Sequence, residues 1–235
     1  MLNAKNITKT FITGEIEQKV LKGIDLKVES GEFISIMGRS GAGKSTLLYI
    51  LSLLDETPSG QVFVDDEEIT LLSGDKAVNY RLNNFGFVFQ EYALLPELNA
   101  LENVALPLLM RGEKKNKAYD IAREALKQVG LENKLENFSS QLSGGEQQRV
   151  SIARAVAHSP KIIFADEPTA NLDTQRSCEI MNIFIDLNKK GQTIIMITHE
   201  LEYAESTHRI VELSDGSIVN DRRMLDPKML LCKLY

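Results

Sequence analysis

The sequence lacks several features that would each place it in a special class of protein. No stretch approaches the roughly 18 consecutive apolar residues of a membrane-spanning helix. Residues 1–5 lack the apolar core of a secretory signal peptide. The formal net charge is −6, so lysine and arginine are not in excess for binding a nucleic-acid backbone. We therefore expect a soluble chain without a nucleic-acid partner.

Cysteine is also scarce, with only Cys178 and Cys232 in the chain. Two cysteines make no disulfide framework, and such usage is typical of proteins in a reducing cytosol. The remaining composition is ordinary for a globular protein, at 43% hydrophobic and 26% charged residues. A length of 235 residues leaves room for one large α/β domain or two small ones.

The hydrophobic pattern alternates between strands and helices. Continuous apolar runs predict buried strands, and apolar residues at helical spacing predict amphipathic helices. The expected buried strands are 33–37, 85–89, 162–165 and 193–197, and the expected helices include 46–51, 118–129, 143–156 and 180–187. Residues 24–28 and 61–64, with the N-terminal segment, predict a small antiparallel sheet, and 210–219 predict a hairpin. This order favours a mostly parallel sheet covered on both faces.

The run from 38 to 45 matches a phosphate-binding loop at every fixed position. Its residues are Gly38, Arg39, Ser40, Gly41, Ala42, Gly43, Lys44 and Ser45. A buried strand precedes the run and a helix follows it, which is the context that the motif needs. Glycines leave backbone N–H groups open to phosphate oxygens, and the helix N-terminus favours negative charge. Lys44 is expected to reach the β- and γ-phosphates, and the hydroxyl of Ser45 to bind Mg²⁺.

The strand at 162–165 delivers two adjacent carboxylates, Asp166 and Glu167. Beside a phosphate loop, one carboxylate can hold a hydrated Mg²⁺ while the other polarises a water for attack on the γ-phosphoryl group. We assign Asp166 to the metal and Glu167 to the water. The alternative is a solvated acidic pair at the start of a loop.

A second glycine-rich helix start occurs at Ser143, Gly144, Gly145 and Glu146. Ser143 can cap this helix, and the glycines expose N–H groups at another anion-accepting helix end. One ATP needs only one such cradle within a subunit. The second therefore indicates use in trans, on a nucleotide held by another copy of the chain.

Together these motifs resemble those of ATP-binding-cassette (ABC) transporter ATPases, over residues 1–220. The resemblance adds Gln90 as the Q-loop glutamine and a metal contact, Asp173 as the D-loop aspartate, and His199 as the switch histidine. Thr46 joins the phosphate loop in binding ATP, and Phe11 is similar in position to the aromatic residue that stacks on adenine, where tyrosine is more usual. Glu146 stands where the family most often has glutamine.

The resemblance implies an α/β fold: a P-loop NTPase (RecA-like) core with a mostly parallel sheet, an antiparallel β subdomain and an inserted α-helical subdomain at about 91–159. Residues 221–235 would be a C-terminal tail or short helix. The catalytic residues would be Glu167, His199 and Gln90, with Ser45, Gln90 and Asp166 around the metal. ATP and Mg²⁺ are the implied cofactors.

The resemblance also implies partners. Two cassettes would close head-to-tail on ATP, so that Ser143, Gly144 and Gly145 of one subunit contact the γ-phosphate on the other, and Glu146 belongs to the same signature motif acting in trans. Residues 89–108 and the variant Glu146 are similar to the lipoprotein-releasing, macrolide-export and cell-division (LolD, MacB, FtsE) group. Integral membrane permease subunits would bind a helical region at about 91–112 and hold the cassette at the cytoplasmic face of the membrane.

Other functions stay open at this point. The main alternative is an ATP-dependent regulator of a membrane complex, similar to FtsE, without transport. A cytosolic protein of translation or DNA repair would need two cassettes or a long coiled-coil insertion, and the sequence has neither. A regulator that does not hydrolyse ATP would be favoured by loss of Glu167 or His199, and both are present.

Overall fold

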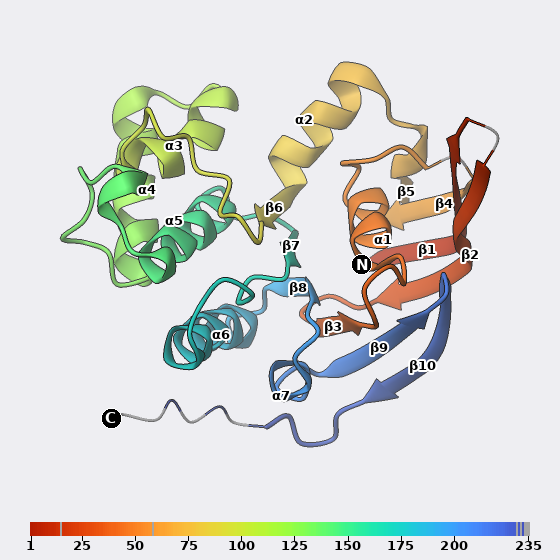
Figure 1. Ribbon diagram of the computed structural model, residues 1–235. Coiled ribbons are helices and arrows are strands. Elements are labelled where there is room, and N and C mark those ends of the chain that lie inside the picture. The colour runs from red at the N-terminus through yellow and green to blue at the C-terminus, as the bar shows by residue number, and fades with distance from the viewer. Residues whose placement is uncertain (15, 58, 229, 231, 233–235) are drawn as a thin grey trace.

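Two β-sheets organise the chain in the computed structural model, which describes residues 1–14, 16–57, 59–228, 230 and 232 (Figure 1). The larger sheet has six strands in the order β10-β9-β3-β8-β7-β6. Its strands are β3 (Phe33–Met37), β6 (Phe85–Val88), β7 (Ile162–Asp166), β8 (Thr193–Ile197), β9 (Arg209–Ser214) and β10 (Ser217–Arg223). All neighbours are parallel except β9 and β10, which form an antiparallel hairpin.

The parallel strands explain where the functional loops meet. Every residue of β7 and β8 is buried, because helices cover both faces of this part of the sheet. Strands that are buried on both faces need continuous apolar runs, which is the pattern found in the sequence of β7 and β8. The carboxyl ends of β3, β6, β7 and β8 lie at one edge, so the loops that follow these strands are brought together there.

The smaller sheet is antiparallel, with four strands in the order β2-β1-β4-β5. Its strands are β1 (Leu2–Thr13), β2 (Ile16–Val28), β4 (Ser59–Val64) and β5 (Glu67–Glu68). Helix α1 (Lys44–Leu51) packs between the two sheets, with Leu47, Leu48, Ile50 and Leu51 in a shared hydrophobic core. The turn η1 (Ile69–Leu71) and α2 (Gly74–Asn84) lead from β5 to β6.

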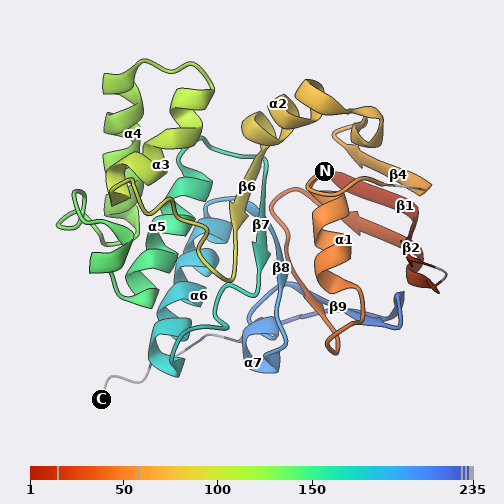
Figure 2. The same cartoon turned by 45° about the horizontal axis from the view of Figure 1, so that its top comes forward.

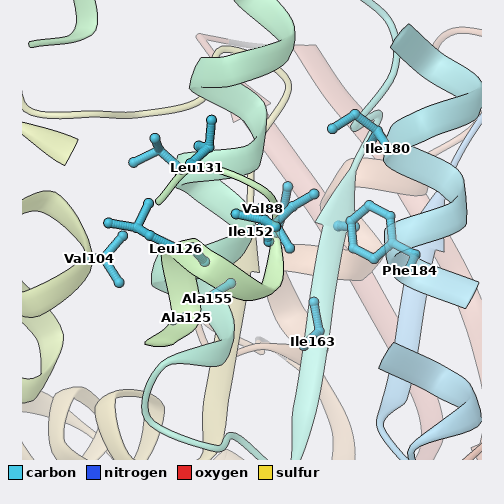
Figure 3. Close-up of a cluster of buried hydrophobic side chains, with 14 of the residues drawn as sticks. Val88, Val104, Ala125, Leu126, Leu131, Ile152, Ala155, Ile163, Ile180 and Phe184 are labelled. Carbon is cyan, nitrogen blue, oxygen red and sulfur yellow. The ribbon is translucent and has the colours of Figure 1, made fainter. Parts of the chain in front are cut away.

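The other face of the six-stranded sheet is covered by helices. These are α3 (Ala100–Met110), α4 (Lys115–Gln128), α5 (Gly144–Val156) and α6 (Thr174–Lys189), with the short η2 (Ser139–Gln141) before α5. Figure 2 shows them opposite α1 and the antiparallel sheet. In Figure 3, Val104 and Leu126 meet Ile152 of α5, while Phe184 of α6 faces the strand that carries Ile163. The short α7 (Leu201–Ala204) follows β8.

This architecture confirms the predicted α/β P-loop fold with its mostly parallel sheet, antiparallel sheet and added helices. Residues 91–99 contain no helix, and α3 starts after the Asn99 cap. Asn99 and Glu102 form a reciprocal capping box that sets this start. The boundaries 1–220 and 91–159 stay predictions. In the described part of 221–235, β10 runs to Arg223 and no residue is helical.

The two cysteines make no disulfide framework, as expected, but they do form a single disulfide that the sequence analysis did not predict. Cys178 of α6 and Cys232 are joined by a disulfide with their Cα atoms 5.6 Å apart. The tail runs back along the molecule, where the Lys228 amide donates to the Glu205 carbonyl at 2.9 Å and Leu230 joins the helical core. Composition cannot reveal this path, because the two cysteines lie 54 residues apart in sequence.

Among the described residues, no helix is both long and apolar enough to cross a membrane.

Candidate nucleotide-binding site

The loop from Gly38 to Gly43 connects β3 to α1 and depends on its glycines. Gly38 and Gly43 have φ values of 151° and 98°. A Cβ atom on Gly38 would lie 2.3 Å from the Leu213 carbonyl oxygen, and one on Gly43 would lie 2.8 Å from Leu21 Cδ2. A side chain at either position would therefore collide with the neighbouring structure. Only glycine permits this loop path.

The first turn of α1 is open to an anion. Gly43 is its N-cap, and no side chain in the described part of the chain caps the helix there. The first amide groups of a helix have no intrahelical acceptors, and the helix dipole makes this end positive. Lys44 Nζ lies under the loop, where it donates to the carbonyls of Gly38 at 3.0 Å and Arg39 at 3.3 Å. These groups form a cradle for phosphate oxygens.

Asp166, the last residue of β7, lies directly across from α1. Its Oδ1 accepts a hydrogen bond from Ser45 Oγ at 3.3 Å, and its Oδ2 accepts one from Tyr49 Oη at 2.9 Å. Burial raises the pKa of Asp166, while the hydrogen bonds from Tyr49 and Ser45 act to lower it. Burial and the contact with Asp166 raise the pKa of Tyr49 to about 12.

Tyr49 was missed in the sequence analysis. The signal that could have found it is spacing: it lies four residues after Ser45, which puts both side chains on one face of α1.

Glu167 and His199 face each other at the ends of β7 and β8. The Glu167 carboxylate and His199 Nδ1 are hydrogen-bonded. Glu167 has φ of 47°, a left-handed conformation that is uncommon for a residue with a side chain. Its amide donates to the Ile197 carbonyl at 3.1 Å, which holds the carboxylate at the sheet edge. Such a conformation is often found at functional positions.

These groups surround one pocket of about 760 Å³. The lining consists of Gln18, Val20, Gly38, Arg39, Ser40, Gly41, Gly43, Lys44, Ser45, Thr46, Tyr49, Gln90, Asp166, Glu167 and His199. Two residues assigned to ATP are outside this lining: Ala42, which is buried, and Phe11, which is 44% exposed. Phe11 pairs across β1 and β2 with Gln18, so it lies beside the pocket.

The donor set suits a magnesium nucleotide. Ser45, Asp166 and Gln90 line the pocket together and offer a hydroxyl, a carboxylate and an amide oxygen. Mg²⁺ prefers such oxygen ligands and commonly uses one or two protein groups together with substrate phosphates and waters. The described residues contain no cluster of three or more His, Cys, Asp or Glu that could hold a metal ion alone. The site therefore fits a metal shared with a phosphate ligand.

The second glycine-rich helix start lies elsewhere. Ser143 caps α5 by accepting from the Glu146 amide at 3.4 Å, and Glu146 Oε2 accepts from the Ser143 amide at 2.8 Å. The hydrogen bond from the Ser143 amide is the main cause of a lowered pKa of Glu146, helped by the Ser143 hydroxyl and Lys134 and partly opposed by burial. A small pocket of about 290 Å³ borders Ser143, Gly145 and Glu146. It shares no lining residue with the nucleotide pocket.

Asp173 is close to this second site in the chain's own fold. It caps α6 by accepting from the Arg176 amide at 2.9 Å. Arg176 also lines the small pocket beside Gly145. Asn171 Nδ2 donates to the Gln90 carbonyl at 3.0 Å. The segment around Asp173 therefore connects the nucleotide pocket with the start of α5.

Known proteins are similar over almost the whole chain. "Lipoprotein-releasing system ATP-binding protein LolD" of Aquifex aeolicus is 48% identical over 221 residues, which cover 94% of this chain and 97% of that protein. "Macrolide export ATP-binding/permease protein MacB" of Chlorobaculum tepidum is 45% identical over 97% of this chain. The chain spans only 35% of that longer protein.

Solved structures agree with this relationship. A dimeric ATP-binding cassette in a post-hydrolysis state, bound to ADP and Pi, matches with a TM-score of 0.89 and 40% sequence identity. The match covers 96% of this chain and 100% of that chain. A family model described as "ABC transporter" matches residues 21–170, a segment that contains the phosphate loop, the start of α5 and the acidic end of β7. The chain therefore belongs to the ABC transporter family, as one of its ATP-binding cassettes.

Proposed function

We propose that this chain binds ATP with Mg²⁺, hydrolyses it, and uses the cycle to drive a membrane permease. The observation that carries the proposal is the convergence of four strand ends on one pocket. The ends of β3, β6, β7 and β8 place a set of polar side chains around a loop suited to phosphate: Lys44, Gln90, Asp166, Glu167 and His199. Phosphoryl transfer requires mainly positioning and charge stabilisation, and these residues offer both.

Each residue has a defined role in this proposal. Backbone amides from Gly38 to Thr46 and the Lys44 ammonium bind the phosphates, and Phe11 packs against the base. Ser45, Asp166 and Gln90 hold the metal, which when bound neutralises developing charge on the phosphates. Glu167 accepts a proton from the attacking water, and His199 orients Glu167 and contacts the γ-phosphate. The hydrogen bond between Glu167 and His199 supports this pairing.

We also propose that the site is completed by a second copy of the chain. Ser143, Gly144 and Gly145 of one subunit would contact the γ-phosphate bound by the other, with Glu146 next to them in the same motif and Asp173 at the junction. Support comes from the separation of the two pockets within one chain and from the dimeric state of the similar solved cassettes. ATP then favours the closed dimer because its γ-phosphate has partners on both sides.

The membrane partner is proposed to bind an apolar groove of about 360 Å³ beside α3. The groove lies where α2, β6, α3 and α5 meet, and residues of 91–112 that line it are Ala93, Leu106, Pro107 and Met110. A short helix of an integral permease subunit would bury this apolar surface and hold the cassette at the inner face of the membrane. The LolD and MacB relatives support export or lipoprotein release.

The variant Glu167→Gln tests the catalytic assignment. Turnover should fall by about 10²–10³-fold because the water loses its base, while ATP binding is kept. The uncleaved nucleotide should then hold two subunits together, and gel filtration with ATP and Mg²⁺ should show a dimer. Glu202→Gln, at an exposed position on α7, is the matched control and should behave as the unchanged protein. A Glu167→Gln protein that hydrolyses ATP at the normal rate would refute the role of Glu167.

A further inference from the structure

Both oxygens of the Asp166 carboxylate are held by side chains from a single helix. Ser45 Oγ donates to Oδ1 at 3.3 Å, and Tyr49 Oη donates to Oδ2 at 2.9 Å. Ser45 and Tyr49 lie one turn apart on α1, and both line the nucleotide pocket. Asp166 itself is only 8% exposed, so few other donors can reach it.

This arrangement restricts how the carboxylate can turn. A carboxylate rotates readily about its last side-chain bond unless hydrogen bonds hold its plane. The neutral tyrosine hydroxyl donates to an ionised carboxylate, and such charge-assisted bonds are stronger than neutral ones. With Oδ2 bonded to Tyr49, Oδ1 stays on the side of Ser45. The hydroxyl oxygen of Ser45 and Oδ1 of Asp166, the two oxygen atoms assigned to the metal, therefore lie side by side in the pocket.

We propose that Tyr49 is a positioning residue, which orients the Asp166 carboxylate for the Mg²⁺ of the bound nucleotide. This role depends on the proposed function, because it concerns the same metal. Residues that orient a metal ligand without touching the metal commonly change metal affinity by about 10–100-fold when they are removed. Tyr49 acts through one hydroxyl, and we expect an effect of about tenfold, at the lower end of that range.

A purely structural role for Tyr49 is the competing explanation. Its ring packs against the core that α1 shares with the two sheets, so the whole side chain also contributes to packing. The variant Tyr49→Phe separates the two roles, because it keeps the ring and removes only the hydroxyl. The chain offers a matched control in Tyr80, which packs against the same core. Its buried hydroxyl has no hydrogen-bond partner among the residues that the structure describes, so Tyr80→Phe removes the same group without breaking a described bond.

The experiment measures metal affinity directly, with Mn²⁺ as a paramagnetic substitute for Mg²⁺. Each protein is titrated with Mn²⁺ in the presence of ATP, and free Mn²⁺ is followed by electron paramagnetic resonance. ATP binding in the presence of a chelator and the thermal midpoint without ligand are measured in parallel. Tyr49→Phe should bind Mn²⁺ about tenfold more weakly with metal-free ATP binding unchanged, and Tyr80→Phe should match the unchanged protein.

Steady-state hydrolysis gives a second readout. In Tyr49→Phe the metal concentration for half-maximal rate should rise about tenfold, and saturating metal should restore the maximal rate. A loss of packing would lower the thermal midpoint and would not be reversed by metal. Equal Mn²⁺ affinity in Tyr49→Phe and the unchanged protein would overturn the positioning role alone. Failure of the unchanged protein to bind Mn²⁺ with ATP would instead overturn the proposed function.

Discussion

Two helices of this cassette, α1 and α5, begin on glycine-rich turns, but only the first turn of α5 is capped by a side chain. At the start of α1, Gly43 is the N-cap, and among the described residues no side chain accepts a hydrogen bond from the first amide groups. At the start of α5, Ser143 and Glu146 exchange hydrogen bonds in a reciprocal capping box. The first site is open and adjoins Lys44, whereas the second is already capped and carries a carboxylate.

The difference indicates how each site can handle a phosphate. The open end of α1 can bind an anion without help, because its amides need partners and Lys44 adds a full positive charge. At the N-terminus of α5, the Glu146 amide already donates to the Ser143 hydroxyl, and the negative charge of the Glu146 carboxylate repels an anion. Lys134, whose Nζ lies 3.4 Å from Glu146 Oε1, offsets part of that charge. This contrast supports the proposal that α5 acts only on a phosphate already held by another subunit.

The largest expected effect is at the open site. Lys44→Ala removes the buried ammonium and should weaken ATP binding by more than about 100-fold, since buried charge-assisted contacts to phosphate contribute several kcal/mol. The fold should survive, because Lys44 is bonded to loop carbonyls and not to the core. Isothermal titration calorimetry of single subunits measures the loss.

Lys19→Ala is the control for Lys44→Ala. Lys19 is exposed on β2 between Gln18 and Val20, which are the strand residues that line the pocket. Its side chain points away from them, because neighbouring residues of a strand face opposite sides. Lys19→Ala should bind ATP normally. Normal ATP affinity in Lys44→Ala would refute the claim that the α1 start is the site that binds phosphate with the help of Lys44.

The next effect is on turnover at the capped site. Ser143→Arg places a large cation where the partner's nucleotide would enter, so hydrolysis should fall by about 10²-fold or more through loss of transition-state contacts. Binding of ATP by one subunit should not change, because Ser143 is absent from the nucleotide pocket. Ser143→Ala measures the cap alone and should cost about 1 kcal/mol of stability. Normal turnover in Ser143→Arg would refute the action in trans.

Ser140→Arg provides the matched charge control for Ser143→Arg. Ser140 is exposed in η2, three residues before the cap. The added charge is the same, but the side chain is not part of the capping box. Turnover should stay within about twofold of the unchanged protein, because exposed charges interact weakly. An equal loss of turnover in both arginine variants would mean that added charge, and not position, is responsible.

Features predicted from local sequence agreed with the structure where one short segment determines them. The strands 33–37 and 193–197, the phosphate loop and the adjacent carboxylates at Asp166 were predicted because apolar runs and glycine spacing are local signals. His199 was expected only from the family resemblance, and the parallel order of β7 and β8 places it with Asp166 in the lining of the nucleotide pocket. The exact start of α3 was not predicted, because the capping box of Asn99 and Glu102 sets it and an apolar run does not.

Features that depend on distant contacts were not predicted. The disulfide requires the tail to return to α6, and nothing in either cysteine's neighbourhood encodes that path. Tyr49 looks like one more apolar residue of an amphipathic helix until β7 places Asp166 opposite its hydroxyl. Its role depends on two segments 117 residues apart in sequence. Local pattern predicts elements, whereas tertiary contact decides which side chains of an element reach the site.

The smallest effect expected is from Glu146→Gln, which removes the charge at the α5 start but keeps an acceptor for the Ser143 amide. The dimer formed with ATP should become tighter by about threefold, because one repulsive charge near the triphosphate is lost. Subunit stability should fall by about 0.5 kcal/mol, since a carboxylate favours a helix N-terminus. The pKa of Glu146 is lowered in the fold, so its contribution is present above the ordinary pKa of glutamate and disappears as pH falls through the lowered value. The stability difference between the two proteins should therefore vanish in acid, as urea unfolding at several pH values would show.

Glu124→Gln, at an exposed position on α4, removes the same charge away from the α5 start and should leave the dimer unchanged. A weaker dimer in Glu146→Gln would mean that the carboxylate helps to bind the nucleotide of the partner subunit. The claim that its charge repels the triphosphate would then be wrong.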